Sequence, residues 1–220
     1  MKLLSFSVYG YNENMLVDNK YVVIEGIDGA GKTTQKKLLI DYLRSNNQVV
    51  CDVKEPGGTL LGEKIRQIIK DSKIVRSPES DFELFNICRR ELAQQIISQE
   101  LTLGHWVICD RNWFSSVAYQ GFGQGLLVES IISQTKKALV DLFLPDISII
   151  IDLPVDMAFN RLKKRHDDIS NDNFESKGLD FYQKVRDGYL WLIKNYSIYK
   201  IDGQQTIKTI NQSIIKLIQN

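Results

Sequence analysis

The chain has 220 residues, and its 28 Lys and Arg nearly balance its 27 Asp and Glu. This length fits a single domain, and a composition that is 43% hydrophobic and 25% charged is ordinary for a protein with a packed core. A formal charge of +1 gives no general attraction to nucleic acid or to an anionic membrane, so we expect neither as a partner and any anion binding to be local.

No targeting or membrane segment is recognisable. The first 20 residues lack a small-residue cleavage pattern, so we expect residues 1–14 to be a poorly ordered extension and residues 15–220 to form one domain. No apolar run approaches the roughly 20 residues that span a bilayer. The cysteines have no paired spacing, which predicts a cytoplasmic protein with reduced, mostly buried thiols at Cys51, Cys88 and Cys109.

Short β-branched runs alternate with helical stretches along the chain. We expect strands at residues 21–25, 48–53, 106–109, 147–152 and 197–201, and helices at 32–45, 60–71, 79–103, 127–143, 155–165, 174–195 and 206–218. This alternation predicts an α/β fold in which a parallel sheet of five strands has helices on both faces. The last helix has one apolar stripe, made of Ile207, Ile210, Ile214, Leu217 and Ile218.

The first expected strand leads into a phosphate-binding loop. Residues 26–33, GIDGAGKT, satisfy G-x-x-x-x-G-K-[ST] and run into helical spacing. The glycines permit positive φ and close backbone approach, so that N–H groups and a helix N-terminus point at phosphate oxygens. Lys32 is placed to reach the β- and γ-phosphates, and the Thr33 hydroxyl to bind Mg²⁺. We expect ATP or GTP to contact Gly26, Ile27, Asp28, Gly29, Ala30, Gly31, Lys32, Thr33 and Thr34.

The third expected strand ends in Asp110 and Arg111, at the edge of the sheet where α/β folds bind ligands. Asp110 is placed to hold Mg²⁺ directly or through water. Arg111 is placed to bind an acceptor phosphate with its two-pronged guanidinium. The alternative is a surface pair that caps the strand. A second anion site beside the phosphate loop would distinguish a kinase from a GTPase or a motor ATPase.

A polar segment, residues 166–177, separates two helical patterns and is a candidate for a mobile lid, which we place near 161–177; a plain solvated loop is the alternative. Arg161 and Arg165 precede it and share one helical face.

At this point the chain resembles the thymidylate kinase family, from residue 21 to about 192. The resemblance rests on residues 25–35 (EGIDGAGKTTQ), 55–59 (EPGGT), 62–69 (GEKIRQII), 84–89 (LFNICR), 185–190 (VRDGYL), and 110–121 with D-R-x-x-x-S-S-x-A-Y-Q spacing. It implies the P-loop nucleoside monophosphate kinase fold with a lid, and Mg²⁺-dependent transfer of the γ-phosphate from ATP to dTMP, giving dTDP. It also implies a homodimer.

The resemblance implies roles for the acceptor-site residues. Phe85 would stack on thymine, and Arg89 would bind the dTMP phosphate or base region. Ser116 and Gln120 would hydrogen-bond the base, and Tyr119 would close over the deoxyribose. From the residues alone, Phe85 reads as a core side chain and Arg89 as a solvated one.

Further roles concern the acceptor phosphate and the sugar. Arg66 and Arg111 match phosphate ligands, Asp28 matches a carboxylate that contacts the sugar 3′-hydroxyl, and Glu55 matches one near the acceptor and its Mg²⁺. The alternative for Glu55 is a turn carboxylate.

The transition-state arginine is expected from the lid, because Gly29 and Ala30 leave the phosphate loop without a basic residue before Lys32. We favour Arg165, then Arg161; a solvated basic helix is the alternative. The catalytic set is thus Lys32, Arg111, Arg165 and Arg161.

Three positions depart from the family pattern: Lys54 replaces an arginine, residues 172–175 (DNFE) lack one, and Gln124 replaces another. Two rivals remain: a kinase of another nucleotide or of a deoxynucleoside, and a non-catalytic nucleotide-binding module.

Overall fold

The computed structural model describes residues 21–139, 144–165 and 178–219. The expected extension at 1–14 and the lid segment 166–177 therefore lie outside the described residues, as does the departure at 172–175.

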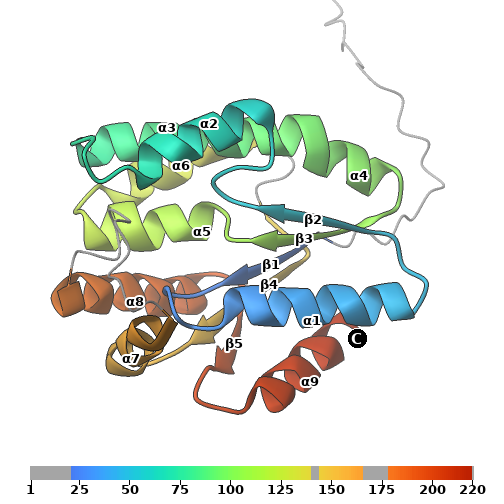
Figure 1. Ribbon diagram of the computed structural model, residues 1–220. Coiled ribbons are helices and arrows are strands. Elements are labelled where there is room, and N and C mark those ends of the chain that lie inside the picture. Colours follow the sequence, from blue (N-terminus) through green and yellow to red (C-terminus); the bar gives the residue numbers. More distant parts are fainter. Residues whose placement is uncertain (1–20, 140–143, 166–177, 220) are drawn as a thin grey trace, which may run out of the picture.

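A sheet of five parallel strands forms the centre of the molecule (Figure 1). The strands are β1 (Tyr21–Glu25), β2 (Val50–Lys54), β3 (Trp106–Asp110), β4 (Ile147–Asp152) and β5 (Tyr199–Asp202). Their order is β2-β3-β1-β4-β5, and every pairing is parallel. The predicted fold class and the five strands are confirmed, with shifts of at most two residues at the strand ends.

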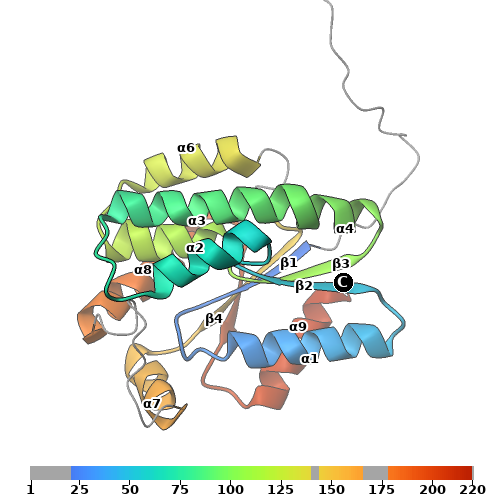
Figure 2. The ribbon, with the colours of Figure 1, turned by 45° about the horizontal axis from the view of Figure 1, so that its top comes forward.

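Helices cover both faces of the sheet (Figures 1 and 2). They are α1 (Lys32–Ser45), α2 (Leu60–Lys70), α3 (Pro78–Leu92), α4 (Ser98–Thr102), α5 (Trp113–Ser116), α6 (Val128–Leu139), α7 (Val155–Arg165), α8 (Gly178–Asn195) and α9 (Ile207–Ile218), with π-helical segments η1 (Ala93–Ile97) and η2 (Val117–Gly123). One face carries α1 and α9. The other carries α3, η1, α4 and α8, and α2 and α6 pack against α3.

The central strand shows why the sheet is buried on both sides. All five residues of β1 are buried. Val22 and Ile24 pack in the larger apolar cluster with Leu39 of α1, whereas Val23 packs in a second cluster with Leu92 at the end of α3. A strand covered on both faces has a continuous apolar run rather than alternation, which is what made it recognisable in the sequence.

No helix was expected between residues 110 and 126, and the structure corrects this for the segment after Arg111. It is helical, as α5 followed by η2. The Asn112 side chain caps α5 by accepting from the Phe114 backbone N–H at 2.9 Å, and the Glu25 carboxylate accepts from the Asn112 and Ser115 N–H groups at 2.8 and 3.1 Å. Tertiary contacts override the weak helix propensity of its aromatic residues and glycines.

Two other expectations also need correction. The helix expected at 79–103 begins at Pro78, with the Ser77 side chain capping it, and its ladder is interrupted by the π-helical turn η1. On α9, Ile210 and Ile214 are buried as expected, but Ile207 is exposed because it begins the helix outside the core.

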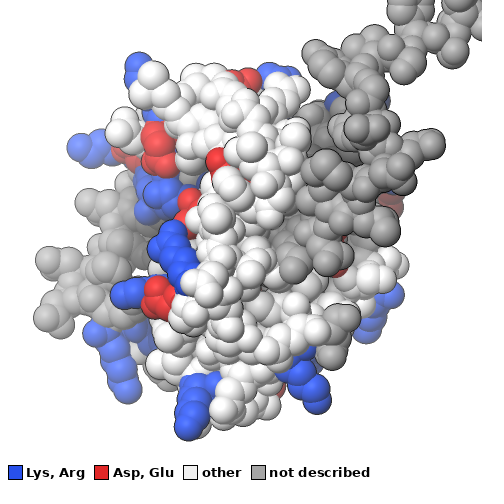
Figure 3. All heavy atoms as spheres, turned by 90° about the vertical axis from the view of Figure 1, so that its right-hand side faces the viewer, with Lys and Arg blue, Asp and Glu red and all other residues white. Residues whose placement is uncertain are grey.

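The cysteines, the charged surface residues and the helix lengths can be compared with the expectations from the sequence. Cys88 and Cys109 are buried, Cys51 is half-buried, and all three are free thiols. On the face drawn in Figure 3, the described Lys and Arg side chains lie mostly toward the margin, with acidic residues among some of them. No helix in the described ranges is long and apolar enough to cross a membrane.

Candidate active site

The phosphate loop connects β1 to α1 and is fitted closely to its neighbours. Gly26 has a φ of 143°, and a Cβ there would lie 2.6 Å from the Ile151 carbonyl oxygen of β4. A Cβ at Gly29, with a φ of 83°, would lie 2.7 Å from the Ala158 carbonyl oxygen of α7. Only glycine fits such positions without displacing backbone. The loop therefore lies against the end of β4 and against α7.

Lys32 begins α1 and is only 7% exposed. Its Nζ donates to the Ile27 carbonyl at 3.0 Å and lies 3.6 Å from Asp28 Oδ1. Burial, together with the nearby Arg111 cation, lowers the pKa of Lys32. An ammonium held inside a phosphate loop in this way is available to a phosphate oxygen.

Thr33 and Asp110 meet where α1 approaches the end of β3. The Thr33 hydroxyl donates to Asp110 Oδ2 at 3.4 Å. Asp110 Oδ1 is buried without a hydrogen-bond partner in the described part of the chain. Mg²⁺ is usually held by one or two protein oxygens together with substrate phosphates. The hydroxyl and the unsatisfied carboxylate oxygen fit that requirement.

Arg111 follows β3 with a φ of 76°, in the left-handed region that non-glycine residues rarely adopt. Its guanidinium donates to the Gly26 carbonyl at 3.1 Å, Ser115 Oγ at 2.9 Å, Tyr189 Oη at 2.9 Å, Tyr119 Oη at 3.3 Å and the Asp28 carboxylate. Residues strained in this way are often found at functional sites. The unusual backbone turn directs this cation at the phosphate loop.

Asp28 is the carboxylate of the phosphate loop, and it is surrounded by donors. Arg111 donates to Oδ1, while Tyr119 and Tyr182 donate to Oδ2 at 2.9 and 3.2 Å. Burial opposes ionisation, but the Arg111 and Lys32 cations and these hydrogen bonds hold the pKa of Asp28 well below its usual range. Asp28 is therefore ionised at any physiological pH.

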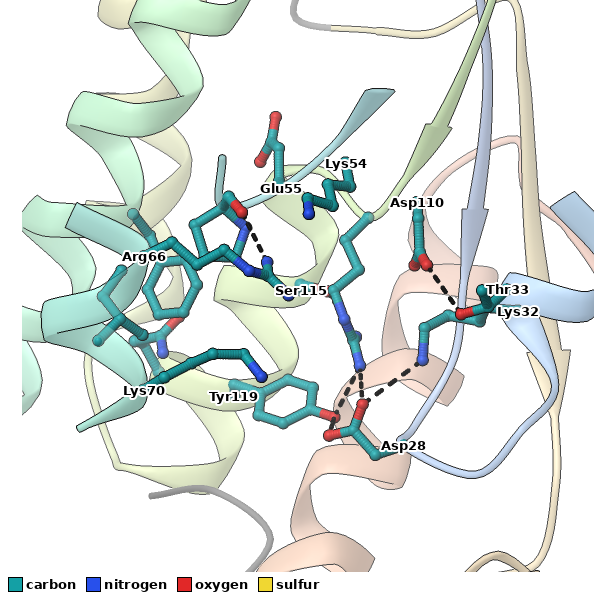
Figure 4. A pocket seen from close by; sticks show the side chains of 15 residues that line it. Asp28, Lys32, Thr33, Lys54, Glu55, Arg66, Lys70, Asp110, Ser115 and Tyr119 are labelled. Atoms are coloured by element: carbon teal, nitrogen blue, oxygen red, sulfur yellow. Dashed lines mark hydrogen bonds and ion pairs between the residues drawn. The ribbon is translucent and has the colours of Figure 1, made fainter. Parts of the chain in front are cut away.

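A cavity of about 240 Å³ opens beside the loop (Figure 4). It is lined by Asp28, Lys32, Thr33, Lys54, Glu55, Pro56, Arg66, Ile69, Lys70, Phe85, Asp110, Arg111, Ser115, Tyr119 and Gln120. A smaller hollow at the loop is lined by Asp28, Gly29, Gly31, Lys32, Thr33, Thr34 and Leu162. Asp28, Lys32 and Thr33 line both spaces, so ligands in the two would meet at these three residues.

The walls of the cavity combine an aromatic ring, cations and an unsatisfied amide. Phe85 of α3 is half-buried and lines the cavity together with Arg66 and Lys70 of α2. Arg66 Nη1 donates to the Pro56 carbonyl at 2.6 Å. Gln120 of η2 is 1% exposed, and its Nε2 is buried without a hydrogen-bond partner among the described residues. This lining suits a planar, polar-edged ring that carries an anionic group.

Arg89 and Ser116 lie behind this wall and are not among the described residues that line the cavity. Arg89 is 1% exposed; its Nε donates to Glu55 Oε2 at 2.8 Å and its Nη2 to Ser116 Oγ at 3.0 Å. Arg89 Nη1 is buried with no hydrogen-bond partner in the described chain. Burial raises the pKa of Glu55 to about 7, although Arg89 opposes the shift.

The residues that lead toward the lid are only partly described. Arg161 of α7 donates through Nη2 to the Gly203 carbonyl at 3.0 Å, so in this structure its guanidinium is held at the turn after β5. The side chain of Arg165 lies outside the described part of the chain.

Two departures from the family pattern have partners of their own. Lys54 lies 3.7 Å from the Glu63 carboxylate, and Gln124 Nε2 donates to Asp81 Oδ2 at 3.0 Å.

Several residues of the site were missed by sequence reasoning. Glu25, at the end of β1, accepts from Ser115 Oγ at 2.7 Å and from Tyr189 Oη at 2.8 Å, which fixes the start of α5. Tyr182 and Lys70 were also missed. Glu25 and Tyr189 fall within motifs that were recognised (EGIDGAGKTTQ and VRDGYL), so a signal existed for them; Tyr182 and Lys70 stand in no motif.

Comparison with known proteins gives one consistent result. The family model described as thymidylate kinase matches residues 24–214. A thymidylate kinase of Thermosipho africanus is 38% identical over 200 residues, which is 90% of this chain and 97% of that protein. Those of Fervidobacterium nodosum and Kosmotoga olearia are 39% and 35% identical over 198 residues each, covering 90% and 89% of this chain and 97% and 93% of those proteins.

Proposed function

Because this chain belongs to the thymidylate kinase family, we propose that the cavity and the smaller hollow, together the two hollows, hold the two substrates of that enzyme. The protein transfers a phosphate from ATP to dTMP and so forms dTDP. ATP occupies the hollow at the phosphate loop, and dTMP occupies the cavity beside Phe85. The observation that carries this proposal is that Asp28, Lys32 and Thr33 line both spaces, which brings donor and acceptor together.

On the donor side, the backbone N–H groups of the loop hold the ATP phosphates at the N-terminus of α1, and Lys32 neutralises the oxygens nearest the transfer point. Thr33 and Asp110 would hold Mg²⁺, supported by the unsatisfied Asp110 oxygen. When bound, the ion supplies charge neutralisation on the phosphates. Glu55, by contrast, lies at the acceptor side of the cavity, where it forms an ion pair with Arg89.

On the acceptor side, Phe85 stacks on thymine. Gln120 Nε2, which lacks a hydrogen-bond partner among the described residues, donates to an oxygen at the edge of the base. Arg111 and Arg66 bind the dTMP phosphate. Arg89 binds the dTMP phosphate or base region and Ser116 the base, as the resemblance implies; the unpartnered Arg89 Nη1 supports this role, and Arg89 also holds Glu55 and Ser116 in place.

Phosphoryl transfer then depends on positioning and on charge. The dTMP phosphate is already a competent nucleophile, so the reaction needs no general base. Asp28 binds the acceptor sugar and Tyr119 closes over it. Arg165, or else Arg161, supplies positive charge in the transition state from the lid.

We also propose that the protein works in the cytoplasm as a homodimer. Three free cysteines suit a reducing compartment. Exposed apolar side chains on α2 and just before α6, including Leu61, Ile68 and Leu127, suit a helix-packed interface. Light scattering coupled to gel filtration tests the dimer, and a monomer mass at micromolar concentration would contradict it.

The proposed substrate is tested by thermal denaturation and turnover together. We expect dTMP alone to raise the melting temperature, because it binds the folded state, and to support ADP release from ATP. Thymidine lacks the phosphate that Arg66 and Arg111 bind, so it should do neither at the same concentration. ADP release with thymidine but not with dTMP would contradict the proposal.

A further inference from the structure

Tyr182 lies in the first turns of α8, and its side chain contacts the phosphate loop, 154 residues earlier in the sequence. Its side chain is 0% exposed, and its hydroxyl donates to Asp28 Oδ2 at 3.2 Å. It is not among the described residues that line either hollow. Its hydroxyl therefore acts on a bound ligand through Asp28.

The ring of Tyr182 is fixed by aromatic neighbours from other elements. It packs edge-on against Phe159 of α7 at 5.2 Å between ring centroids, and against Tyr119 of η2 at 6.3 Å. Burial raises the pKa of Tyr182, so the hydroxyl keeps its proton and remains a donor. A phenol held on two sides in a close-packed interior cannot leave the carboxylate without moving α7 or η2.

The two oxygens of Asp28 have different partners. Oδ2 accepts from the hydroxyls of Tyr119 and Tyr182, which approach from η2 and α8. Oδ1 accepts from Arg111 and lies 3.6 Å from Lys32 Nζ. Arg111 is the proposed ligand of the acceptor phosphate. When it turns to that phosphate, Oδ1 becomes available to another donor while the two tyrosines keep Oδ2 in place.

The chemistry of dTMP leaves one donor for that oxygen. At neutral pH dTMP has two hydrogen-bond donors, the N3–H of thymine and the 3′-hydroxyl of the sugar. The N3–H lies on the base edge, which in the proposed binding mode faces the Gln120 side chain and not Asp28. The other donor is the 3′-hydroxyl, and the family resemblance assigns it to Asp28, the carboxylate that lines both hollows.

We propose that Tyr182 is a positioning residue for the acceptor: by holding Asp28 Oδ2, it presents Oδ1 to the 3′-hydroxyl of dTMP and so favours acceptors that carry this hydroxyl. The inference rests on the proposed function. Without the phenol, the carboxylate keeps Tyr119 but can rotate, and its hydrogen bond to the sugar weakens.

The test compares Tyr182→Phe with the wild-type protein on dTMP and on 3′-deoxythymidine monophosphate, which lacks the hydroxyl. Dissociation constants are measured by calorimetry, and KM and kcat by ADP release. One indirect hydrogen bond predicts a dTMP dissociation constant about fivefold higher in the variant. Binding of the 3′-deoxy nucleotide and the KM for ATP should change by less than about twofold.

Tyr196→Phe is the matched control, because Tyr196 is half-buried in an aromatic cluster and lines neither hollow among the described residues; it should leave both dissociation constants unchanged. An equal loss of affinity for the two nucleotides in Tyr182→Phe, or no loss for either, would overturn the inference while dTMP turnover by the wild-type protein sustains the proposed function. Absence of dTMP turnover in the wild-type protein would overturn both.

Discussion

Replacing Arg111 with lysine tests the acceptor-phosphate site directly. The guanidinium donates to five protein groups through Nη1 and Nη2, and it approaches the phosphate loop from one fixed direction. Lysine keeps the positive charge but has a single ammonium with three donors and no fork. Asp28 would keep its two tyrosine donors, so the loop should remain folded. The change therefore removes the forked arrangement of donors and leaves the positive charge of the side chain.

The magnitude follows from the hydrogen bond that lysine cannot make to the phosphate. A hydrogen bond to a charged group contributes about 1.5–3 kcal/mol, which corresponds to a loss of about 10- to 150-fold in kcat/KM for dTMP. The assay is coupled ADP release with dTMP varied at saturating ATP. The KM for ATP should change little, because the residues of the phosphate loop, to which Arg111 does not belong, bind that substrate.

Arg186→Lys is a matched control. Arg186 of α8 also donates twice to a carboxylate, to Asp152 Oδ1 at 2.7 Å and Oδ2 at 3.2 Å, but it lines neither hollow in the described structure. It should affect melting temperature more than catalysis. A kcat/KM for dTMP within about threefold of wild type in Arg111→Lys, or an equal loss in both variants, would refute the reasoning.

Three further predictions concern other parts of the site. Phe85→Ala should raise the KM for dTMP about tenfold or more through lost stacking and leave the KM for ATP nearly unchanged; equal effects on both would argue against stacking. Asp110→Asn should raise the Mg²⁺ concentration needed for half-maximal turnover at least about tenfold, and an unchanged Mg²⁺ titration would remove Asp110 from the metal site. Folded Glu55 keeps its proton up to about pH 7, whereas the unfolded chain releases it near 4.5. The folded state thus binds more protons between these two pH values. The unfolding free energy of wild type, relative to that of Glu55→Gln, should therefore fall as the pH rises through this range. The same pH dependence of the unfolding free energy in both proteins would contradict the raised pKa.

Local patterns were enough to predict the framework of the molecule. The run from Tyr21 to Glu25 is apolar because both of its faces are covered, and the spacing of Gly26, Gly29 and Gly31 meets a need for positive φ that is visible in the sequence itself. Both signals are contained within a dozen residues. The sheet, most of its helices and the phosphate loop could therefore be placed before the structure was known.

Contacts between distant residues could not be predicted in this way. The segment after Arg111 is helical partly because Glu25, 87 residues before Asn112, accepts its N–H. Arg89 pairs with Glu55 across 34 residues, and nothing near either residue signals the pair. The family resemblance assigned Arg89 to the substrate, and this role stays a prediction. Its burial, which the sequence did not signal, depends on how α3 packs against the EPGG turn. Tyr182 reaches Asp28 across 154 residues.

Coupled ADP release with ATP, Mg²⁺ and a panel of dTMP, dUMP, dCMP, dGMP, AMP and thymidine tests the central claim most directly. The account predicts strong preference for dTMP, because Phe85 and Gln120 meet the base, Arg66 and Arg111 meet the phosphate, and Asp28 meets the sugar. Preference for another nucleotide would keep the phosphate chemistry and contradict the base site. If a folded protein that binds ATP released no ADP with any compound of the panel, the assignment as an active kinase would be contradicted.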